Sequence, residues 1–224
     1  AAYSYYTSNK EESAVLTWDG GGDFYTTNAY TSTSISYWKN KKLVWFERVG
    51  NSDMGSLWHI YSKVIFQNPF AAGKLMGLAA MGNDSLIPEF KKYAMRPVRG
   101  CLSPTYSIKN CWPDEDMPLY GTANSWKHND AANIAYAIQN LTIEAGVGLA
   151  NKAFEITNSN NLCISGGCAL NGYLNTEIIK QTNFKDVVVP PSVHDGGLSI
   201  GAVMFTINNI LDLFWSIRFW EILL

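Results

Sequence analysis

Residues 164–175 read ISGGCALNGYLN and lie between the short apolar run Leu162-Cys163 and the segment TEIIKQTNF. The pattern predicts a strand, a loop with two glycines, and a helix that starts near Ala169 and carries Asn171 on its first turn. Glycines at such a crossing let a ligand approach the main chain, and the free N–H groups at a helix start favour anions such as phosphate. The stretch therefore predicts a ligand-binding loop between a strand and a helix.

A second unit of the same kind follows in the sequence. The strand-like VVVP at 187–190 leads through HDGG at 194–197 into the apolar segment LSIGAVMFTINNIL. Two such units in tandem are typical of a parallel α/β sheet. Neither loop matches a P-loop or a dinucleotide-binding fingerprint, so each one alone is also explained as a tight strand-to-helix turn.

A third glycine loop occurs near the start of the chain, in LTWDGGGDFYTT at 16–27. Asp19 and Asp23 flank three glycines, whereas an ordinary hairpin turn needs one or two. A glycine run beside carboxylates indicates close approach to a phosphate and its metal, although for Asp23 a solvated turn residue is the favoured interpretation. Three such loops in one chain favour a nucleotide cleft between two lobes.

Composition excludes several classes of function. The chain has 224 residues, of which 47% are hydrophobic, so it can bury a full core. Its net charge of −2 offers no basic field for nucleic acid or an anionic membrane surface. The four cysteines, at 101, 111, 163 and 168, have no CxxC spacing and are interpreted as reduced and structural, in a cytoplasmic protein, rather than as zinc ligands.

Hydrophobic periodicity predicts the remaining elements. Strands are expected at 14–18 and within 25–49, and a helix from Met54 with Leu57, Ile60, Tyr61 and Val64 on one face. A long helix is expected over 128–158, with Asn129 or Asp130 as its N-cap. The apolar segment 200–224 is interpreted as a buried amphipathic helix rather than a membrane span, because three charged residues interrupt it. Residues 93–126 have no clear period and are expected to form an irregular insertion or lid.

Five ordered motifs resemble the carbamoyltransferases of the NodU and CmcH type. They are DGGGD at 19–23, GKLMGLAAMG at 73–82, DAANIAYAIQ at 130–139, SGGCALN at 165–171 and VPPSVHDGGLSIGA at 189–202. The resemblance covers residue 1 to about residue 209. The second motif departs from the family's usual LAPYG, because Ala80 and Met81 stand there.

The resemblance implies an α/β fold of the actin-like, hexokinase-like ATPase class, with ribonuclease H-like lobes around a nucleotide cleft. The expected division is a first lobe at 1–90, the insertion at 91–127 and a second lobe at 128–224. Family members precede this part with a paired-histidine segment and follow it with a YrdC-like C-terminal lobe. Both are absent here, so a fragment of a longer protein is expected.

The resemblance also implies a chemistry. In the family, carbamoyl phosphate and ATP give carbamoyl adenylate, and the carbamoyl group then passes to a hydroxyl of a small-molecule acceptor. A divalent metal, iron or alternatively magnesium, is expected beside the nucleotide. Two alternatives stay open at this point: a kinase-like or threonylcarbamoyl-transfer relative with the same fold, and a non-catalytic nucleotide-binding module.

Site residues are carried over from the family motifs. Asp19 and Asp195 are expected to be catalytic and to hold the metal. The expected nucleotide contacts are Gly20, Gly21, Gly22, Lys74, Gly166, Gly167, Asn171 and Gly196. Plainer interpretations remain for three of these residues, since Asp195 could cap the helix at Gly196, Asn171 could bond its own backbone, and Lys74 could be solvated. His59 and His128 are given no catalytic role. For His194, a position that faces solvent or supports the site from behind is favoured over one that reaches the cleft.

Overall fold

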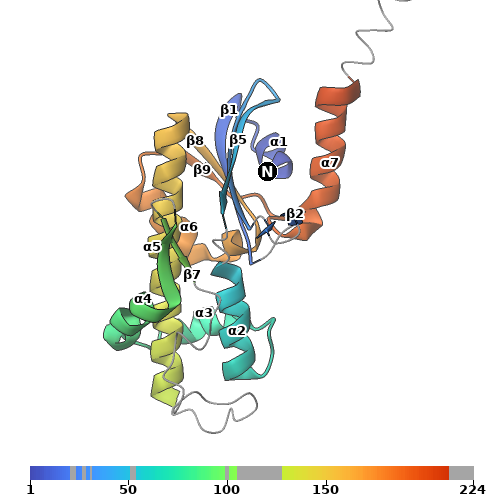
Figure 1. Cartoon of the computed structure of the whole chain (residues 1–224). Helices are drawn as coiled ribbons and strands as arrows, with labels where there is room; N and C mark the ends of the chain where they lie inside the picture. Colours follow the sequence, from blue (N-terminus) through green and yellow to red (C-terminus); the bar gives the residue numbers. More distant parts are fainter. Residues whose placement is uncertain are drawn as a thin grey trace, which may run out of the picture.

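A five-stranded mixed sheet forms the centre of the protein, in a computed structural model that describes residues 1–20, 24–26, 29–30, 32–50, 54–98, 101–104 and 128–211. Its strands are β1 (Glu12–Trp18), β4 (Thr33–Lys39), β5 (Lys42–Gly50), β8 (Asn161–Ser165) and β9 (Asp186–Val188). The order across the sheet is β5-β4-β1-β8-β9, and Figure 1 shows these strands side by side. The predicted α/β fold class is confirmed.

The central strand β1 is antiparallel to β4 and parallel to β8, which is in turn parallel to β9. Leu16 of β1 lies opposite Ile35 of β4 and Ile164 of β8, and all three side chains are buried. A strand that is covered on both faces reads as a continuous apolar run, which explains the sequence AVL at its centre. Strands from both predicted lobes, 1–90 and 128–224, thus share one sheet, and the predicted lobe division itself stays a prediction.

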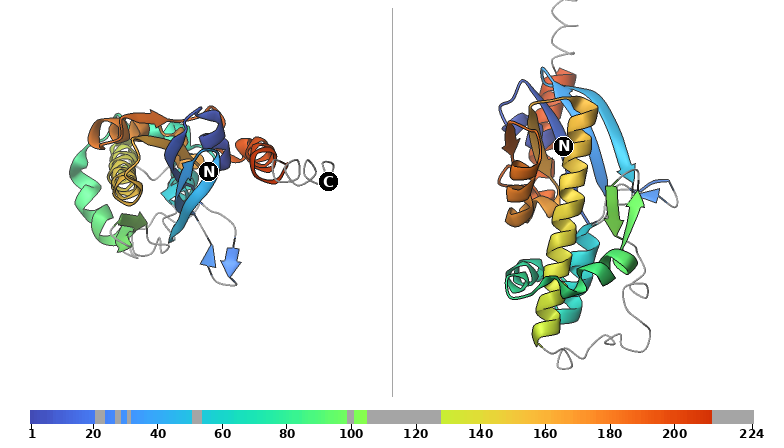
Figure 2. Two further views of the ribbon diagram at one scale, coloured as in Figure 1. Left: turned by 90° about the horizontal axis from the view of Figure 1, so that it is seen from above. Right: turned by 90° about the vertical axis from the view of Figure 1, so that its left-hand side faces the viewer.

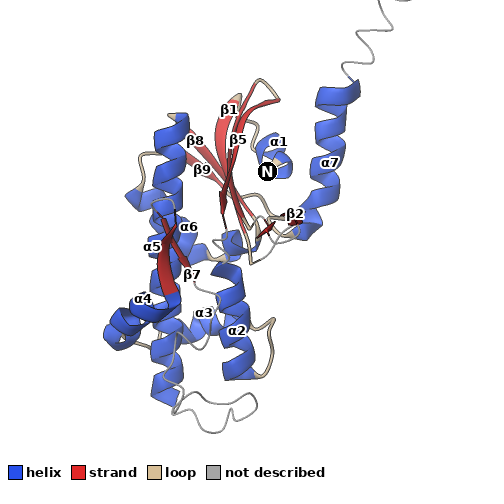
Figure 3. Cartoon of the chain, viewed as in Figure 1, coloured by secondary structure: helices blue, strands red, loops and turns tan. Residues whose placement is uncertain are grey.

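Helices cover both faces of the sheet (Figure 3). On one face lie α5 (His128–Thr157) and α6 (Gly172–Gln181), whose apolar side chains join a core with Leu16 and Trp18. On the other face α1 (Ala2–Thr7) packs through Tyr5 against Val15 and Trp38. Successive residues of β1 therefore alternate between the two cores, as side chains on a strand must.

The helix α5 continues beyond the sheet and supports a second, helical part of the protein (Figure 2). There α2 (Met54–Phe66), α3 (Ala72–Ala79) and α4 (Ile87–Ala94) pack against it, with the short 3-10 turn η1 (Asp84–Leu86) before α4. The indole N–H of Trp58 donates to the hydroxyl of Thr142 at 2.9 Å and joins α2 to α5. In α2, Leu57 and Tyr61 of the predicted face are buried, so the predicted period is confirmed.

Two helix starts differ from the prediction. The long helix α5 begins at His128, so Asn129 and Asp130 lie in its first turn and neither is the N-cap. The helix expected from Ala169 begins only at Gly172, because the 3-10 turn η4 (Gly167–Leu170) comes first. Asn171 is the N-cap of α6, one residue before its first turn. Side-chain capping by asparagine outweighs the apolar spacing in setting this start.

The segment expected to be irregular contains a small antiparallel hairpin, β6 (Met95–Val98) with β7 (Cys101–Pro104), and residues 105–127 lie outside the described part of the chain. A second small antiparallel pair, β2 (Phe24–Thr26) with β3 (Ala29–Tyr30), follows the glycine loop after β1. Proline is compatible with strands at an edge, and both strands of β6–β7 are edges of a two-stranded ladder. The expectation of an irregular segment is therefore wrong for 95–98 and 101–104.

The last described helix, α7 (Leu198–Thr206), continues into a π-helical turn, η6 (Ile207–Leu211), and packs against α1. Its apolar side chains are largely exposed, including Leu198 at 68% and Val203 at 58%. The expectation of a buried helix is wrong for this part, because only Gly201 of α7 is buried. No helix among the described residues combines the length and the hydropathy that crossing a bilayer requires.

Candidate functional site

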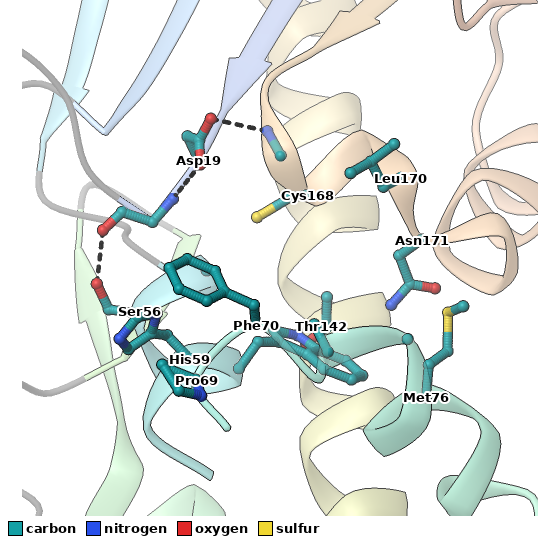
Figure 4. Close-up of a pocket in the computed structure, with 16 residues that line it drawn as sticks. Asp19, Ser56, His59, Pro69, Phe70, Met76, Thr142, Cys168, Leu170 and Asn171 are labelled. Carbon is teal, nitrogen blue, oxygen red and sulfur yellow. Dashed lines mark hydrogen bonds between the residues drawn. The ribbon is translucent and has the colours of Figure 1, made fainter. Parts of the chain in front are cut away.

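Two loops meet where the parallel strands β1 and β8 end. Asp19 directly follows β1, and Gly167 lies two residues after β8. One carboxylate oxygen of Asp19, Oδ2, accepts the backbone N–H of Gly167 at 2.8 Å, and Oδ1 accepts that of Gly20 at 2.7 Å (Figure 4). The carboxyl ends of parallel strands are the usual position of ligand sites in α/β sheets. The carboxylate thus holds the two glycine loops together at this edge.

Gly166 fits the loop after β8 as no other residue could. Its φ of 94° lies in the left-handed half of conformational space, and a Cβ atom there would lie 2.2 Å from the carbonyl oxygen of Trp18. Its N–H donates to the carbonyl of Val193 at 2.8 Å, in the loop that follows β9. Gly166 therefore packs the ends of β1 and β8 directly against each other and connects both to the loop after β9.

The start of α2 is held against the glycine loop after β1 by a contact between the backbones of Gly55 and Gly20. A Cβ atom on Gly55 would lie 2.5 Å from the nitrogen of Gly20, and one on Gly20 would lie 2.7 Å from the carbonyl carbon of Gly55. The neighbouring Ser56 hydroxyl donates to the carbonyl of Gly20 at 2.5 Å. The absence of two side chains lets α2 form one wall of the site.

A cavity of about 730 Å³ opens between these loops and the helices α2 and α3. Its polar end is formed by Asp19, Gly20, Ser56 and Gly167. The wall on the side of α2 and α3 is mostly apolar and is formed by Trp58, Pro69, Phe70 and Met76. Figure 4 shows Leu170, at the end of η4, on the other side of the cavity, near Cys168. Its volume is typical of small-molecule sites, and so is the combination of an apolar lining with a few convergent polar groups.

Asn171 lines the cavity, but most of the hydrogen-bonding groups of its side chain already have partners within the protein. Its Oδ1 accepts the N–H of Leu174 at 3.1 Å as the N-cap of α6. The Asn171 and Gln139 amides also bond reciprocally, at 3.1 and 3.2 Å, and both side chains are buried. The plainer interpretation, in which Asn171 bonds its own backbone, is therefore present in the structure. One N–H of its amide is left over in this set of bonds, and its contact with a nucleotide stays a prediction.

Comparison with known proteins identifies the family. The family model for the carbamoyltransferase N-terminus matches residues 1–204, which is most of the chain. The chain belongs to the carbamoyltransferase N-terminus family. The resemblance expected from the five motifs is confirmed, and so, at the level of the family, is the expectation of an enzyme.

Relatives of the carbamoyltransferase N-terminus include nodulation proteins. The chain is 26% identical over 212 residues to nodulation protein NolNO of Sinorhizobium fredii, a match that covers 91% of this chain and 29% of the relative. It is 33% identical over 99 residues to nodulation protein U of Azorhizobium caulinodans, which covers 42% of this chain and 17% of the relative. The chain therefore spans less than a third of the length of these two curated relatives.

A solved structure of full-length HypF, in a phosphate- and nucleotide-bound form, is similar over 94% of this chain and 41% of its own length. The sequence identity is 17% and the TM-score is 0.49.

The structure brings some of the predicted site residues together and leaves others apart. Asp19, Gly20, Gly167 and Asn171 all line the cavity, whereas Gly166 lies behind its wall. Lys74 is exposed on α3 and is not part of the lining, although its neighbour Gly73 is. Gly21, Gly22 and Asp23 lie outside the described residues.

Asp195 lies in the loop after β9, on the surface. The preceding residue, His194, is the N-cap of the 3-10 turn η5 (Asp195–Gly197), because its Nδ1 accepts the N–H of Gly196 at 3.0 Å. The alternative in which Asp195 is the cap is therefore wrong. Asp195 and Gly196 are exposed, and neither lines the cavity that Asp19 lines.

The predicted metal needs a group of ligand side chains close together. Within that part of the chain, no three histidine, cysteine, aspartate or glutamate side chains are grouped closely enough to hold a metal ion. Both oxygens of Asp19 accept backbone N–H groups, and Asp195 is exposed. The metal roles of Asp19 and Asp195 stay predictions, and no step below depends on a metal.

The residues of the α2–α3 wall were not predicted as site residues. His59, Phe70 and Met76 lie in segments whose apolar spacing indicates only a helix core or a loop. Cys168 was predicted as a structural residue, and it is buried but also lines the cavity. The glycine at 55 was the one signal available, because a glycine in the first turn of a predicted helix indicates a close backbone approach.

Thiol chemistry offers a test of the cavity. In a variant with Cys101 and Cys111 replaced by serine, we expect iodoacetamide to alkylate Cys168 at least about tenfold faster than Cys163. Burial raises the pKa of the Cys163 thiol, so less of it is thiolate at neutral pH, whereas Cys168 borders the cavity. Peptide mass spectrometry measures both rates. Equal rates would mean that the cavity gives no access to Cys168.

Proposed function

We propose that the chain is the nucleotide- and acceptor-binding part of an O-carbamoyltransferase. The observation that carries the proposal is the Asp19 carboxylate, bonded to the N–H groups of Gly20 and Gly167 at the end of a cavity, in a member of the carbamoyltransferase N-terminus family. In the proposed reaction, carbamoyl adenylate made from ATP and carbamoyl phosphate donates its carbamoyl group to a hydroxyl of a small-molecule acceptor.

The transfer step needs a donor and an acceptor in contact. The acceptor oxygen attacks the carbamoyl carbon, a new C–O bond forms, and the bond from that carbon to the phosphate oxygen breaks to release AMP. Effective molarities of well-oriented groups show that holding the two together is itself a large part of catalysis. We assign the adenylate to the loops after β1 and β8, where glycines let it approach the backbone.

Asp19 is assigned two roles in this step. Its hydrogen bonds fix both loops, and its carboxylate, which lines the cavity, is proposed to accept a hydrogen bond from the hydroxyl of the acceptor. A carboxylate in that position orients the hydroxyl and receives its proton as the new C–O bond forms. The chain supplies no other carboxylate among the described residues that line the cavity, which supports the choice of Asp19.

Other assignments carry over from the family motifs as proposals. Asp195 and a divalent metal are proposed to act beside the nucleotide, and Lys74 to reach its phosphates or ribose. The reaction is proposed to take place in the cytoplasm, where ATP is available. The acceptor is proposed to be a small molecule, since the net charge of −2 gives no basic surface for nucleic acid.

Product mass tests the proposal. The protein is incubated with synthetic carbamoyl adenylate, ¹³C-labelled in the carbamoyl group, and a library of hydroxyl compounds. We expect an acceptor that gains one labelled carbamoyl group, with AMP released in equal amount. A parallel incubation with ATP and labelled carbamoyl phosphate tests formation of the adenylate. Phosphorylation of the acceptor from ATP would instead establish the kinase-like alternative, and the absence of any nucleotide binding would exclude both.

A further inference from the structure

The apolar wall of the cavity carries a feature that the proposed transfer step does not use. The Phe70 side chain lines the cavity, yet the residue is 86% exposed, so it adds almost nothing to the core. A single exposed apolar side chain is common on protein surfaces, but Phe70 also lines the cavity, and aromatic side chains in the lining of a cavity are typical contacts of a bound small molecule. The ring is therefore available to whatever enters.

The loop that carries Phe70 is held in a defined shape. The Phe70 N–H donates to the side-chain oxygen of Asn68 at 2.9 Å, and the Ala71 N–H donates to the Asn68 carbonyl at 3.2 Å. Gln67, the first residue after α2, has a φ of 56°, in the left-handed region. These bonds fix where the Phe70 side chain leaves the backbone.

A second aromatic ring orients the first. The His59 ring lies edge-to-face with the Phe70 ring, with centroids 5.7 Å apart and an interplanar angle of 88° (Figure 4). Trp58 contributes to the same wall, and its indole N–H is already bonded to Thr142. Edge-to-face pairs are favourable arrangements of aromatic rings. The outer face of Phe70 thus stays free to stack on a ligand.

The charge of the cavity lining restricts the class of ligand that can bind. Asp19 is the only aspartate, glutamate, lysine or arginine among the described residues that line the cavity, and two backbone N–H groups partly neutralise it. One partly neutralised carboxylate attracts a polycation only weakly. The lining also has no lysine or arginine among its described residues to neutralise an acceptor with several negative charges. It suits a neutral molecule with one apolar face.

We propose that Phe70, held by His59, is a specificity-determining residue that selects neutral hydroxyl acceptors with an aromatic or apolar ring face. This rests on the proposed function, which already gives the strand-end loops to the nucleotide and leaves the α2–α3 wall for the acceptor. The ring of the acceptor stacks on Phe70 and its hydroxyl reaches toward Asp19.

The test measures binding without any reaction. Affinities of the protein for phenyl β-glucoside, methyl β-glucoside and kanamycin are measured by calorimetry and saturation-transfer NMR. We expect phenyl β-glucoside to bind more tightly than the other two. Phe70→Ala is expected to weaken it about tenfold, and Phe70→Tyr to restore most of the affinity. Tyr173→Ala is the matched control, because this aromatic residue is also exposed, at 56%, but does not line the cavity.

Two outcomes would overturn the proposal. One is an unchanged affinity for phenyl β-glucoside in Phe70→Ala; if the affinity for ATP falls in that variant, the ring is assigned to the adenine base instead. The other is tighter binding of kanamycin than of phenyl β-glucoside. These results are separate from the fate of the proposed function. Carbamoyl transfer is judged from product mass, so transfer to a charged acceptor would keep the function and remove the selectivity.

Discussion

Replacing Gly166 with alanine is expected to destabilise the protein by at least about 3 kcal/mol, or to prevent folding. Two effects combine at this position. The φ of 94° is strained for any residue with a Cβ atom, and that atom would lie 2.2 Å from the backbone oxygen of Trp18. Backbone atoms cannot rotate away as a flexible side chain could, so β1 and β8 must separate.

Urea unfolding followed by circular dichroism measures this effect. The matched control is Gly172→Ala, in the same segment, because a Cβ atom there would have no neighbour within 4 Å. We expect the control to be neutral or slightly stabilising, since alanine favours a helix over glycine. A Gly166→Ala protein with a free energy of unfolding within about 1 kcal/mol of the parent would show that the two loops are not packed as described.

Replacing Asp19 with alanine is expected to lower kcat/KM for transfer from carbamoyl adenylate by at least about a hundredfold. The change removes the acceptor of two backbone N–H groups, so the loops after β1 and β8 lose their connection. It also removes the proposed hydrogen-bond acceptor for the acceptor hydroxyl. Asp19→Asn keeps the size of the side chain but presents an N–H₂ group to one of the two N–H donors, and it is expected to be similarly impaired.

The control for the two Asp19 variants is Asp84→Ala. This change removes an exposed carboxylate from the turn before α4 and leaves the cavity lining intact. Circular dichroism establishes that each variant is folded before rates are compared. Transfer at the parental rate by a folded Asp19→Ala protein would exclude Asp19 from the reaction. A loss of transfer with unchanged affinity for the adenylate would assign Asp19 to the chemical step rather than to nucleotide binding.

The parts of the fold with a strong periodic signal could be predicted from the sequence. The long helix α5, the helix α2 and the strands β1, β8 and β9 all lie where apolar spacing placed them. The glycine loops at Gly20 and Gly167 were predicted as well, and the cavity brings both together. These features depend on neighbours in the chain or on glycine, whose conformational role is visible in a sequence.

Features that depend on distant partners could not be predicted. The pairing of Asn171 with Gln139 joins residues 32 positions apart, and no local pattern indicates it. Phe70 belongs to the cavity only because α2 and α3 fold against α5, and in the sequence it resembles any loop aromatic. The exposure of α7 was missed for the same reason, since an apolar run predicts burial without naming the surface that would cover it.

The contact between Gly20 and Gly55 has a consequence for laboratory evolution of this protein toward new acceptors. Neither position can take a side chain unless the backbone of the other moves away, so we expect most clones of a library that randomises either one to be destabilised. Phe70 and Met76, on the wall formed by α2, α3 and the segment between them, line the cavity and take no part in that backbone contact. Productive diversity is therefore expected there, on a wall whose attachment to the sheet is left unchanged.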